Sequence, residues 1–387
     1  MSAPPIAPPR GFRDILPLEA HELAVIESVL AETFESAGFV PLHPPLLEHG
    51  AIDPDHRRVQ FIDSDGRLVA LRPDLTTSVA RLVAGRYGTV AGQLRLSYIA
   101  PVYRQEPSHT AGAREILQAG VELVGTSDTL TDAEILALLA EAIERCGLCV
   151  GESTIHVGDV RLVEALFASL GAPDRARVLA CLRAGDVVGA LATARDAGMT
   201  RAELESARDA LARAGETPVD CAGELGRTLD LARECWPGRQ VRWGSVNLGV
   251  IPAFPYYTGI VFEAVHPDAG IIASGGRYDL LLGAYGAPRP AIGFAIDVLQ
   301  LHRALVAGGW SPNGRGPLLL LQASRDERAT MRCLRAFRSA GFAVALDEIA
   351  ETAGRNAIRG EVLDEERIRL ADGTVTDAAG LRARRGG

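Results

Sequence analysis

The chain has 387 residues, of which 47% are hydrophobic and 23% are charged, and its formal net charge is −9. This size and composition are ordinary for two or three globular domains with a sizeable core. The negative charge gives no global attraction to nucleic acid. The sequence contains no run of 18 apolar residues, and its start, MSAPPIAPPR, has neither the basic head nor the apolar stretch of a signal peptide. We therefore expect a cytoplasmic protein that binds neither membranes nor, through its overall charge, nucleic acid.

Six cysteines are scattered along the chain instead of forming a disulfide framework, and a cytosolic compartment would keep them reduced. Cys146 and Cys149 make one C-x-x-C, but no second pair accompanies it. We therefore expect neither a metal site nor redox chemistry there.

The first predicted helix covers about residues 19–37 and stops at Gly38. Its apolar residues recur every three or four positions, at Leu23, Ile26, Leu30 and Phe34. We expect this stripe, together with the strand around Pro45, to be buried at a two-fold interface between two copies of the chain, although a helix that covers a sheet within one subunit fits the spacing equally well. The next segment, FVPLHPPLLE, predicts a strand broken by its paired prolines.

Residues 98–125 predict a β-hairpin, in which an apolar strand runs into a polar loop and returns as a second strand. Arg104 leaves the first strand, and Gln118 and Glu122 lie four apart on the second. Side chains four apart on a strand point to the same side. Such a hairpin can hold a small zwitterion or a nucleotide, and a hairpin with a solvated polar face is the alternative.

The middle of the chain predicts mainly scaffold. Thr131 to Glu134 predict a capping box for a helix that ends near Cys146, with four residues inward: Ile135, Leu138, Leu139 and Ala142. A strand at 153–157 follows. Residues 160–234 predict several helices, with breaks at Gly171, Gly185 and Thr217-Pro218.

Strands return at 242–248 and at IVFEAV, which follows Tyr256 and Tyr257. Paired tyrosines beside a pocket can supply an apolar wall and a phenolic hydrogen bond. Residues 283–286 predict a loop, and 291–296 predict a buried strand or the start of a helix. From Pro317 the chain predicts a strand, a helix to about Gly341, a strand and a final hairpin, IRLADGTVTD.

In chain order these segments resemble the class II aminoacyl-tRNA synthetases in their histidyl form. Tyr103-Arg104-x-Glu106 and Gln118-x-Gly120-x-Glu122 resemble the two strands of motif 2. The first helix and its proline-bearing strand resemble motif 1, which forms the dimer interface in that family. Further resemblances are Leu71 to Thr76, where Asp74 takes the place of a glutamate, the histidyl signature of Tyr256-Tyr257-Thr258-Gly259 with Gly275 to Asp279, and the opening of motif 3 at 291–296.

The resemblance implies an α/β (α+β) fold, with an antiparallel sheet flanked by helices. It implies a discontinuous synthetase-like core at 1–158 and 241–312, a helical insertion at 159–240 and a small C-terminal α/β unit at 313–387. This last unit is too short to be a whole anticodon-binding domain.

The resemblance also implies a pocket for free histidine. Asp74, Thr76 and Gln118 match the positions that take the ammonium group, and Glu122 and Tyr256 match those that take the imidazole. Arg104 and Tyr257 complete the expected site.

The pattern fails where amino-acid activation needs positive charge. Pro252 and Gln300 stand in the places of two arginines of the family, and Pro107 replaces a third. Charge that develops on the phosphoryl oxygens during adenylation must be met by fixed cations. We therefore expect no aminoacylation activity.

A pocket that keeps the amino acid without the activation machinery resembles the regulatory subunits of ATP phosphoribosyltransferase. This resemblance implies a non-catalytic dimeric subunit without a cofactor. It would work with a short catalytic subunit in the first step of histidine biosynthesis and convey feedback by histidine. Two alternatives remain: an active histidyl-tRNA synthetase, and a synthetase-like module that acts on tRNA or on another protein.

Overall fold

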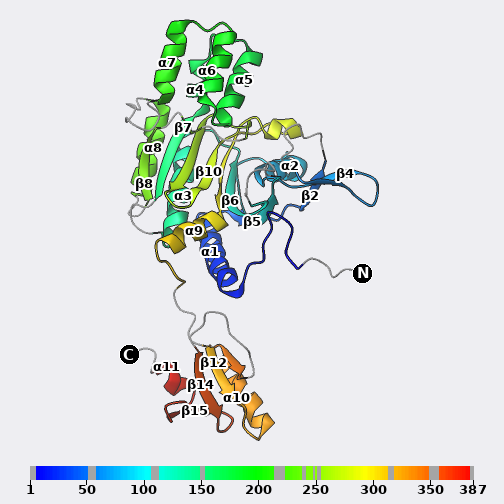
Figure 1. Ribbon diagram of the computed structural model, residues 1–387, viewed down its shortest axis with the longest axis vertical. Coiled ribbons are helices and arrows are strands. Elements are labelled where there is room, and N and C mark those ends of the chain that lie inside the picture. The colour runs from blue at the N-terminus through cyan, green and yellow to red at the C-terminus, as the bar shows by residue number, and fades with distance from the viewer. Residues whose placement is uncertain are drawn as a thin grey trace. The chain divides into compact units, whose positions relative to one another are not determined.

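The computed structural model describes ten stretches of the chain: residues 6–50, 58–105, 113–148, 153–212, 223–237, 241–246, 249–250, 254–312, 318–347 and 357–383. Within them the chain forms two compact units, Met1–Asp14 with Leu23–Trp310 and Ile15–Glu22 with Ser311–Gly387 (Figure 1). None of the described helices is long and apolar enough to cross a membrane. The following predicted positions lie outside the described residues: Glu106, Pro107, Cys149, Thr217, Pro218 and Pro252.

The first unit is built on an eight-stranded sheet with the order β1-β5-β6-β11-β10-β9-β7-β8. In that order the strands are Val40–Pro41, Leu94–Tyr103, Glu115–Val124, Ala291–Asp297, Gly270–Arg277, Ile260–His266, Ser153–Asp159 and Val241–Val246. The inner neighbours pair antiparallel, and only the edge strands β1 and β8 pair parallel. The centre of the sheet is therefore antiparallel, as predicted, and its parallel edge strands make the whole sheet mixed. Residues 291–296 belong to its strand β11 and are not the start of a helix.

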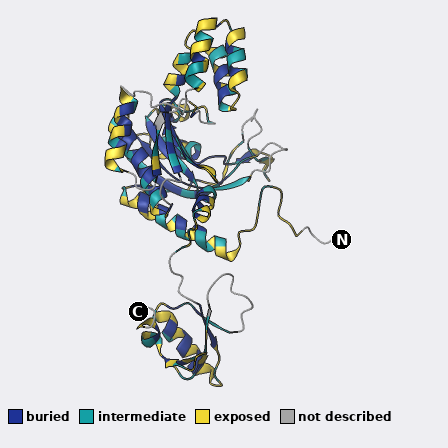
Figure 2. Cartoon of the chain, turned by 60° about the vertical axis from the view of Figure 1, so that its left-hand side comes forward, coloured by how far each residue is buried: buried dark blue, intermediate teal, exposed yellow. Residues whose placement is uncertain are grey.

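Helices cover one face of this sheet. They are α1 (Pro17–Ser36), α3 (Thr129–Arg145), α8 (Glu224–Cys235) and α9 (Val298–Ala307), and their buried side chains form one core with alternate residues of the strands. Figure 2 shows this buried layer between helices and sheet. The four inward residues predicted for α3 belong to this core.

The apolar stripe of α1 corrects one prediction. Its four residues are at most 3% exposed in the single chain and belong to the chain's own core, where Phe34 packs edge-on against Phe294 of β11. The stripe therefore covers the sheet within one subunit and is not exposed for a two-fold interface. Periodicity shows that a helix has an apolar face, but it does not show what covers that face.

Three further predictions need correction. The helix α3 is capped by Asp128, whose side chain accepts a hydrogen bond from Thr131 N at 2.8 Å, because Asp128 has the extended backbone of an N-cap and Thr131 already lies in the helix. FVPLHPPLLE is not one strand: it contributes β1 and β2 (Leu47–His49), which belong to different sheets. Residues 282–285 form a short 3-10 helix where a loop was expected.

The opposite face of the sheet carries a second, smaller core. It contains α2 (Thr76–Tyr87), the 3-10 helix Leu282–Tyr285 and side chains of β5 and β6. Beside it lies a three-stranded sheet of β2, β4 (Leu68–Leu71) and β3 (Gln60–Ile62), in which β3 and β4 form an antiparallel hairpin.

The predicted helical segment forms four short helices with a core of their own: α4 (Val160–Leu166), α5 (Ala172–Arg183), α6 (Val187–Asp196) and α7 (Arg201–Ala212). The predicted breaks at Gly171 and Gly185 fall before and after α5. The next helix, α8, packs against α3 instead.

The second unit has a five-stranded sheet with the order β13-β12-β14-β15-β16. Its elements are β12 (Leu318–Gln322), α10 (Glu327–Ser339), β13 (Val344–Leu346), β14 (Ala357–Val362), β15 (Ile368–Leu370), β16 (Val375–Thr376) and α11 (Ala378–Ala383). β12 and β13 are parallel and flank α10 in the chain, as the predicted β-α-β pattern requires, and β15 and β16 form the final hairpin. The strand β14 was not predicted.

Candidate functional site

On the face of the large sheet opposite α1, glycines lie next to large polar side chains of the neighbouring strands. Tyr98 of β5 pairs with Gly120 of β6, and a Cβ added to Gly120 would lie 2.6 Å from the Tyr98 hydroxyl. Likewise, a Cβ added to Gly293 of β11 would lie 1.9 Å from the Glu122 carboxylate. Glycine at these positions gives the tyrosine ring and the carboxylate room to lie over the sheet.

Glu122 lies at the centre of this face and is only 1% exposed. Its Oε1 accepts hydrogen bonds from Thr76 Oγ1 at 2.7 Å and from the Tyr98 hydroxyl at 3.2 Å, and its Oε2 accepts one from the Tyr278 hydroxyl. Burial raises the pKa of Glu122 to about 7, and the three hydroxyl donors oppose that rise. One carboxylate thus connects β6, β5, the start of α2 and the end of β10.

Asp74 precedes α2 and is 4% exposed. Its Oδ1 accepts hydrogen bonds from Thr77 N at 2.7 Å and Thr77 Oγ1 at 2.8 Å. No described residue donates a hydrogen bond to its Oδ2. Burial raises the pKa of Asp74, because a desolvated carboxylate is costly until a cation compensates it. The charge of Arg104 opposes this rise in pKa, and Oδ2 remains an acceptor for a positively charged donor.

Arg104 and a group of aromatic rings also line the site. Arg104 Nε donates to Pro73 O at 2.9 Å, and its guanidinium lies 5.2 Å from the centroid of the Phe254 ring. Phe254 stacks on Tyr256, and Tyr256 contacts Tyr257. This wall combines one fixed cation with apolar surface and phenolic hydroxyls.

All the predicted site residues except Glu122 line one cavity: Asp74, Thr76, Arg104, Gln118, Tyr256 and Tyr257. Glu122 lies behind that lining, in contact with Thr76 and with Tyr278, which also lines the cavity. The volume is about 30 Å³, the space of about one water. In this conformation the cavity is too small for an amino acid, so some of the side chains that line it would have to move for one to enter.

A larger cavity of about 260 Å³ adjoins the first and shares with it Arg104, Gln118, Phe254, Tyr257, Ser274 and Ala295. Its lining also includes the carboxylates of Glu263 and Asp297. Gln118 Oε1 is buried between the two cavities and has no hydrogen-bond partner among the described residues.

Sequence reasoning missed the roles of Tyr98, Tyr278 and Phe254. Tyr98 was the first residue of the predicted hairpin, and its register opposite Gly120 is the signal that could have placed it on the Glu122 side. Tyr278 lies in the Gly275 to Asp279 part of the histidyl signature, but no pattern in the sequence shows which side chain its hydroxyl reaches.

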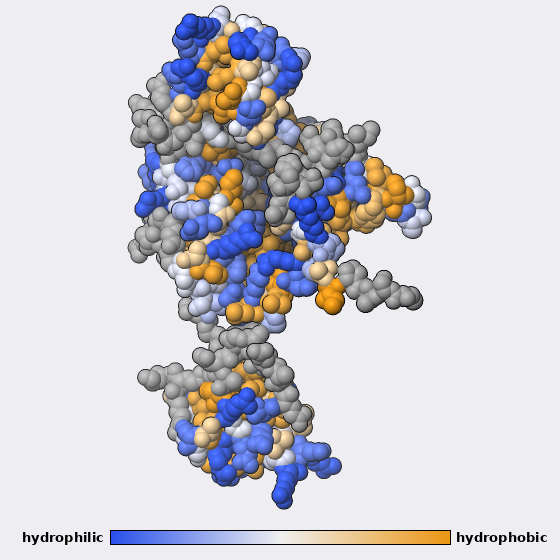
Figure 3. Space-filling view, in the orientation of Figure 1, coloured by the Kyte–Doolittle hydropathy of each residue, from blue (hydrophilic) through white to orange (hydrophobic). Residues whose placement is uncertain are grey.

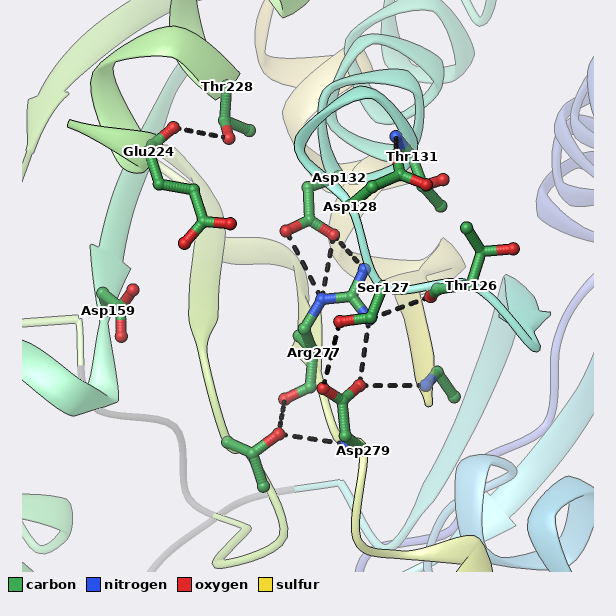
Figure 4. A network of polar contacts seen from close by, with 12 residues as sticks. Thr126, Ser127, Asp128, Thr131, Asp132, Asp159, Glu224, Thr228, Arg277 and Asp279 are labelled. Carbon is green, nitrogen blue, oxygen red and sulfur yellow. Dashed lines mark hydrogen bonds and ion pairs between the residues drawn. The ribbon is translucent and has the colours of Figure 1, made fainter. Parts of the chain in front are cut away.

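A buried ion-pair network holds Tyr278 in place (Figure 4). Arg277 Nε donates to Asp132 Oδ1 at 3.0 Å, and Arg277 Nη1 pairs with Asp279 Oδ1 at 2.9 Å. Thr258 Oγ1 accepts from Asp279 N at 3.0 Å, which connects the network to the segment that follows Tyr257. The start of α3, the end of β10 and the paired tyrosines are therefore fixed together.

Gln300, in the first turn of α9, lies at a position where the resemblance predicts an arginine. Its side chain accepts a hydrogen bond from Arg303 at 3.1 Å and lines neither cavity. Among the described residues, no group of three or more histidine, cysteine, aspartate or glutamate side chains is placed to hold a metal ion.

Comparison with known proteins gives one consistent family. A family model described as histidyl-tRNA synthetase matches residues 11–301. An ATP phosphoribosyltransferase regulatory subunit of Moorella thermoacetica is 34% identical over 386 residues, which cover 92% of this chain and 97% of the relative. Among solved structures, an ATP phosphoribosyltransferase regulatory subunit/histidyl-tRNA synthetase from Bacillus halodurans is 26% identical with a TM-score of 0.77 and covers 93% of this chain and 100% of that one.

A histidyl-tRNA synthetase from Nostoc is 18% identical, with a TM-score of 0.77 and full coverage of both chains, and shares the fold. The mixed sheet flanked by helices is therefore the class II synthetase fold. With matches that span most of its length, the chain belongs to the family of ATP phosphoribosyltransferase regulatory subunits, which has a histidyl-tRNA synthetase-like domain.

Proposed function

We propose that this chain binds free histidine and works as the non-catalytic subunit of a cytoplasmic complex with a short-form ATP phosphoribosyltransferase catalytic subunit. In this complex it would permit the first step of histidine biosynthesis and convey feedback by histidine. Membership of the regulatory-subunit family supports the assembly, and the composition of the cavity supports the ligand.

One observation carries the choice of ligand: a single cavity has a carboxylate oxygen without a hydrogen-bond donor among the described residues, and a guanidinium held by a backbone carbonyl. Asp74 and Arg104 both line it, so a zwitterion can place its ammonium at Asp74, beside Thr76 and Gln118, and its carboxylate near Arg104. Charge-assisted hydrogen bonds of this kind are about twice as strong as neutral ones.

The choice of an imidazole side chain depends on Glu122 and Tyr256. A buried carboxylate that accepts from hydroxyl groups can exchange one of these donors for an imidazole N–H. Tyr278 and Thr76 lie between Glu122 and the cavity, so their hydroxyls are the donors that the ligand would displace. Tyr256 and Tyr257 would then enclose the ring.

Titration calorimetry with histidine tests the ligand. We expect Glu122→Gln and Asp74→Asn each to weaken histidine binding at least about thirtyfold, because truncating one partner of a buried charged contact costs about 2–5 kcal/mol. Glu205→Gln, an exposed position on α7, is the matched control and should bind like the wild type. Undiminished binding in both pocket variants would contradict the proposed site.

Reconstitution with the short catalytic subunit tests the role. Catalytic activity should require this chain, and histidine should inhibit the complex. Asp74→Asn should assemble normally but need more histidine for inhibition. A complex that forms and is equally inhibited with Asp74→Asn would place the feedback site elsewhere, and a catalytic subunit that is fully active alone would contradict the regulatory role.

A further inference from the structure

The larger cavity beside the proposed histidine pocket is lined by more acidic than basic side chains. Two of its polar groups are carboxylates, Glu263 of β9 and Asp297 at the end of β11, and the amide of Gln118 and the hydroxyls of Tyr257 and Ser274 complete the polar lining. Arg104, at the junction with the first cavity, is the single positively charged side chain in this lining. Its Nε already donates to a backbone carbonyl, and its guanidinium lies against Phe254.

Glu263 is the acceptor with the least compensation. No described residue forms a hydrogen bond or ion pair with its carboxylate, and burial raises its pKa. Its neighbours across the sheet are Ser274 on β10 and His156 on β7, so the carboxylate lies in a row of polar side chains on the cavity face. Burying a carboxylate without a hydrogen-bond partner costs free energy. A ligand that donates a hydrogen bond lowers this cost, and a cationic donor lowers it most because charge-assisted hydrogen bonds are the strongest.

Two further groups point to the same kind of ligand. Asp297 uses Oδ1 to accept from Leu299 N and Gln300 N at the start of α9, each at 3.0 Å, and no described residue donates to its Oδ2. Gln118, only 8% exposed, has a buried Oε1 without a partner. An amide oxygen has two lone pairs, so Gln118 can serve this cavity as well as the first.

The rest of the lining suits a hydrocarbon chain. Ile116, Ile271 and Ile272 line the cavity with Ala273 and Ala295. Its volume of about 260 Å³ corresponds to about nine waters, or to a ligand of about as many heavy atoms. We propose that this cavity is a second binding site, which takes an aliphatic amine or guanidine beside the amino-acid pocket and rejects anionic groups.

Agmatine, a guanidine and an amine on a four-carbon chain, is the probe, and glutarate is its anionic counterpart. In ligand-observed NMR titrations of the full chain without histidine, agmatine should bind and glutarate should not. Glu263→Gln should weaken agmatine at least about tenfold, the factor expected for loss of about 1.4 kcal/mol in one charge-assisted contact. The exposed control Glu205→Gln should leave the affinity unchanged.

Asp297→Asn is the second variant, because asparagine keeps the N-cap of α9, and it too should weaken agmatine. Failure of agmatine to bind, equal affinity in both cavity variants and the wild type, or tighter binding of glutarate would overturn the proposal. Because agmatine is titrated alone, failure of the histidine proposal would appear separately, as absence of histidine binding in the same protein.

Discussion

The protonation of Glu122 makes the stability of the folded chain depend on pH. Its pKa in the folded chain is about 7, against 4.5 for a free glutamate, so the native state binds a proton that the unfolded chain has already lost between those values. The stabilisation from this proton is fully present below pH 4.5 and is lost as the pH rises through 7. The shift corresponds to about 3 kcal/mol of the free energy of unfolding.

Glu122→Gln removes this titration and nearly keeps the shape of the side chain. Urea unfolding at pH 5 and pH 8 should show the wild type losing about 3 kcal/mol more than the variant over this interval. The exposed substitution Glu205→Gln should follow the wild-type profile. Parallel profiles for Glu122→Gln and the wild type would mean that Glu122 is charged throughout this range.

The resemblance of the sequence motifs to a known family was enough to predict six of the residues that line the smaller cavity: Asp74, Thr76, Arg104, Gln118, Tyr256 and Tyr257. Gln118 and Glu122 lie on one face because strand alternation requires it. The partners of Glu122 were not predictable, because Thr76 and Tyr278 come from distant segments and only packing brings their hydroxyls to one carboxylate. The cap of α3 was also misplaced, because Thr131 and Glu134 have the spacing of a capping box, whereas the N-cap in the structure is Asp128, three residues earlier.

At the level of elements, the Arg277 network joins α3 to β10. The Arg277 and Asp132 side chains are 7% and 10% exposed, and burial raises the pKa of Asp132 while Arg277 opposes that rise. Breaking a buried pair by removing one partner costs about 3–5 kcal/mol, because the other charge stays buried. The segment that carries Tyr278 should therefore depend on this pair.

We expect Asp132→Asn to destabilise the chain by about 3 kcal/mol in urea unfolding, the low end of that range, since Asp279 still pairs with Arg277. The control is Asp196→Asn, in an ion pair whose partners are 66% and 70% exposed, which should cost at most about 1 kcal/mol. Histidine affinity should fall in Asp132→Asn and not in Asp196→Asn, through the displaced Tyr278. Equal stability of the two variants would show that the buried pair is not needed.

For the whole molecule, the α1 stripe does not supply a dimer interface, but other apolar surface is exposed. Ile62 and Leu68 face each other across β3 and β4 and are 63% and 39% exposed, and Figure 3 shows apolar side chains gathered there. A self-complementary patch closes most simply as a two-fold dimer. We therefore retain the dimer as a prediction and place its interface near β3 and β4.

Light scattering at micromolar concentration should give the mass of a dimer for the wild type. Ile62→Asp should shift it toward the monomer, because a carboxylate would be buried in the interface without a partner. Val188→Asp, at an 80% exposed position on α6, should stay dimeric. A wild-type monomer, or a dimer unaffected by Ile62→Asp, would place self-association elsewhere or exclude it.

The charges around the two cavities also predict which chemistry the whole chain lacks. Among the described lining residues Arg104 is the one cation, whereas Asp74, Glu263 and Asp297 are acids. Adenylation must bind a triphosphate and stabilise charge on its α-phosphate, and removing one fixed donor at such a centre costs about 10²–10³ in rate. We therefore expect no histidine-dependent exchange of pyrophosphate into ATP above a protein-free blank, with an active histidyl-tRNA synthetase as positive control. Sustained exchange would show that cations from another part of the chain complete the site. The chain would then be a synthetase and not a sensor of free histidine.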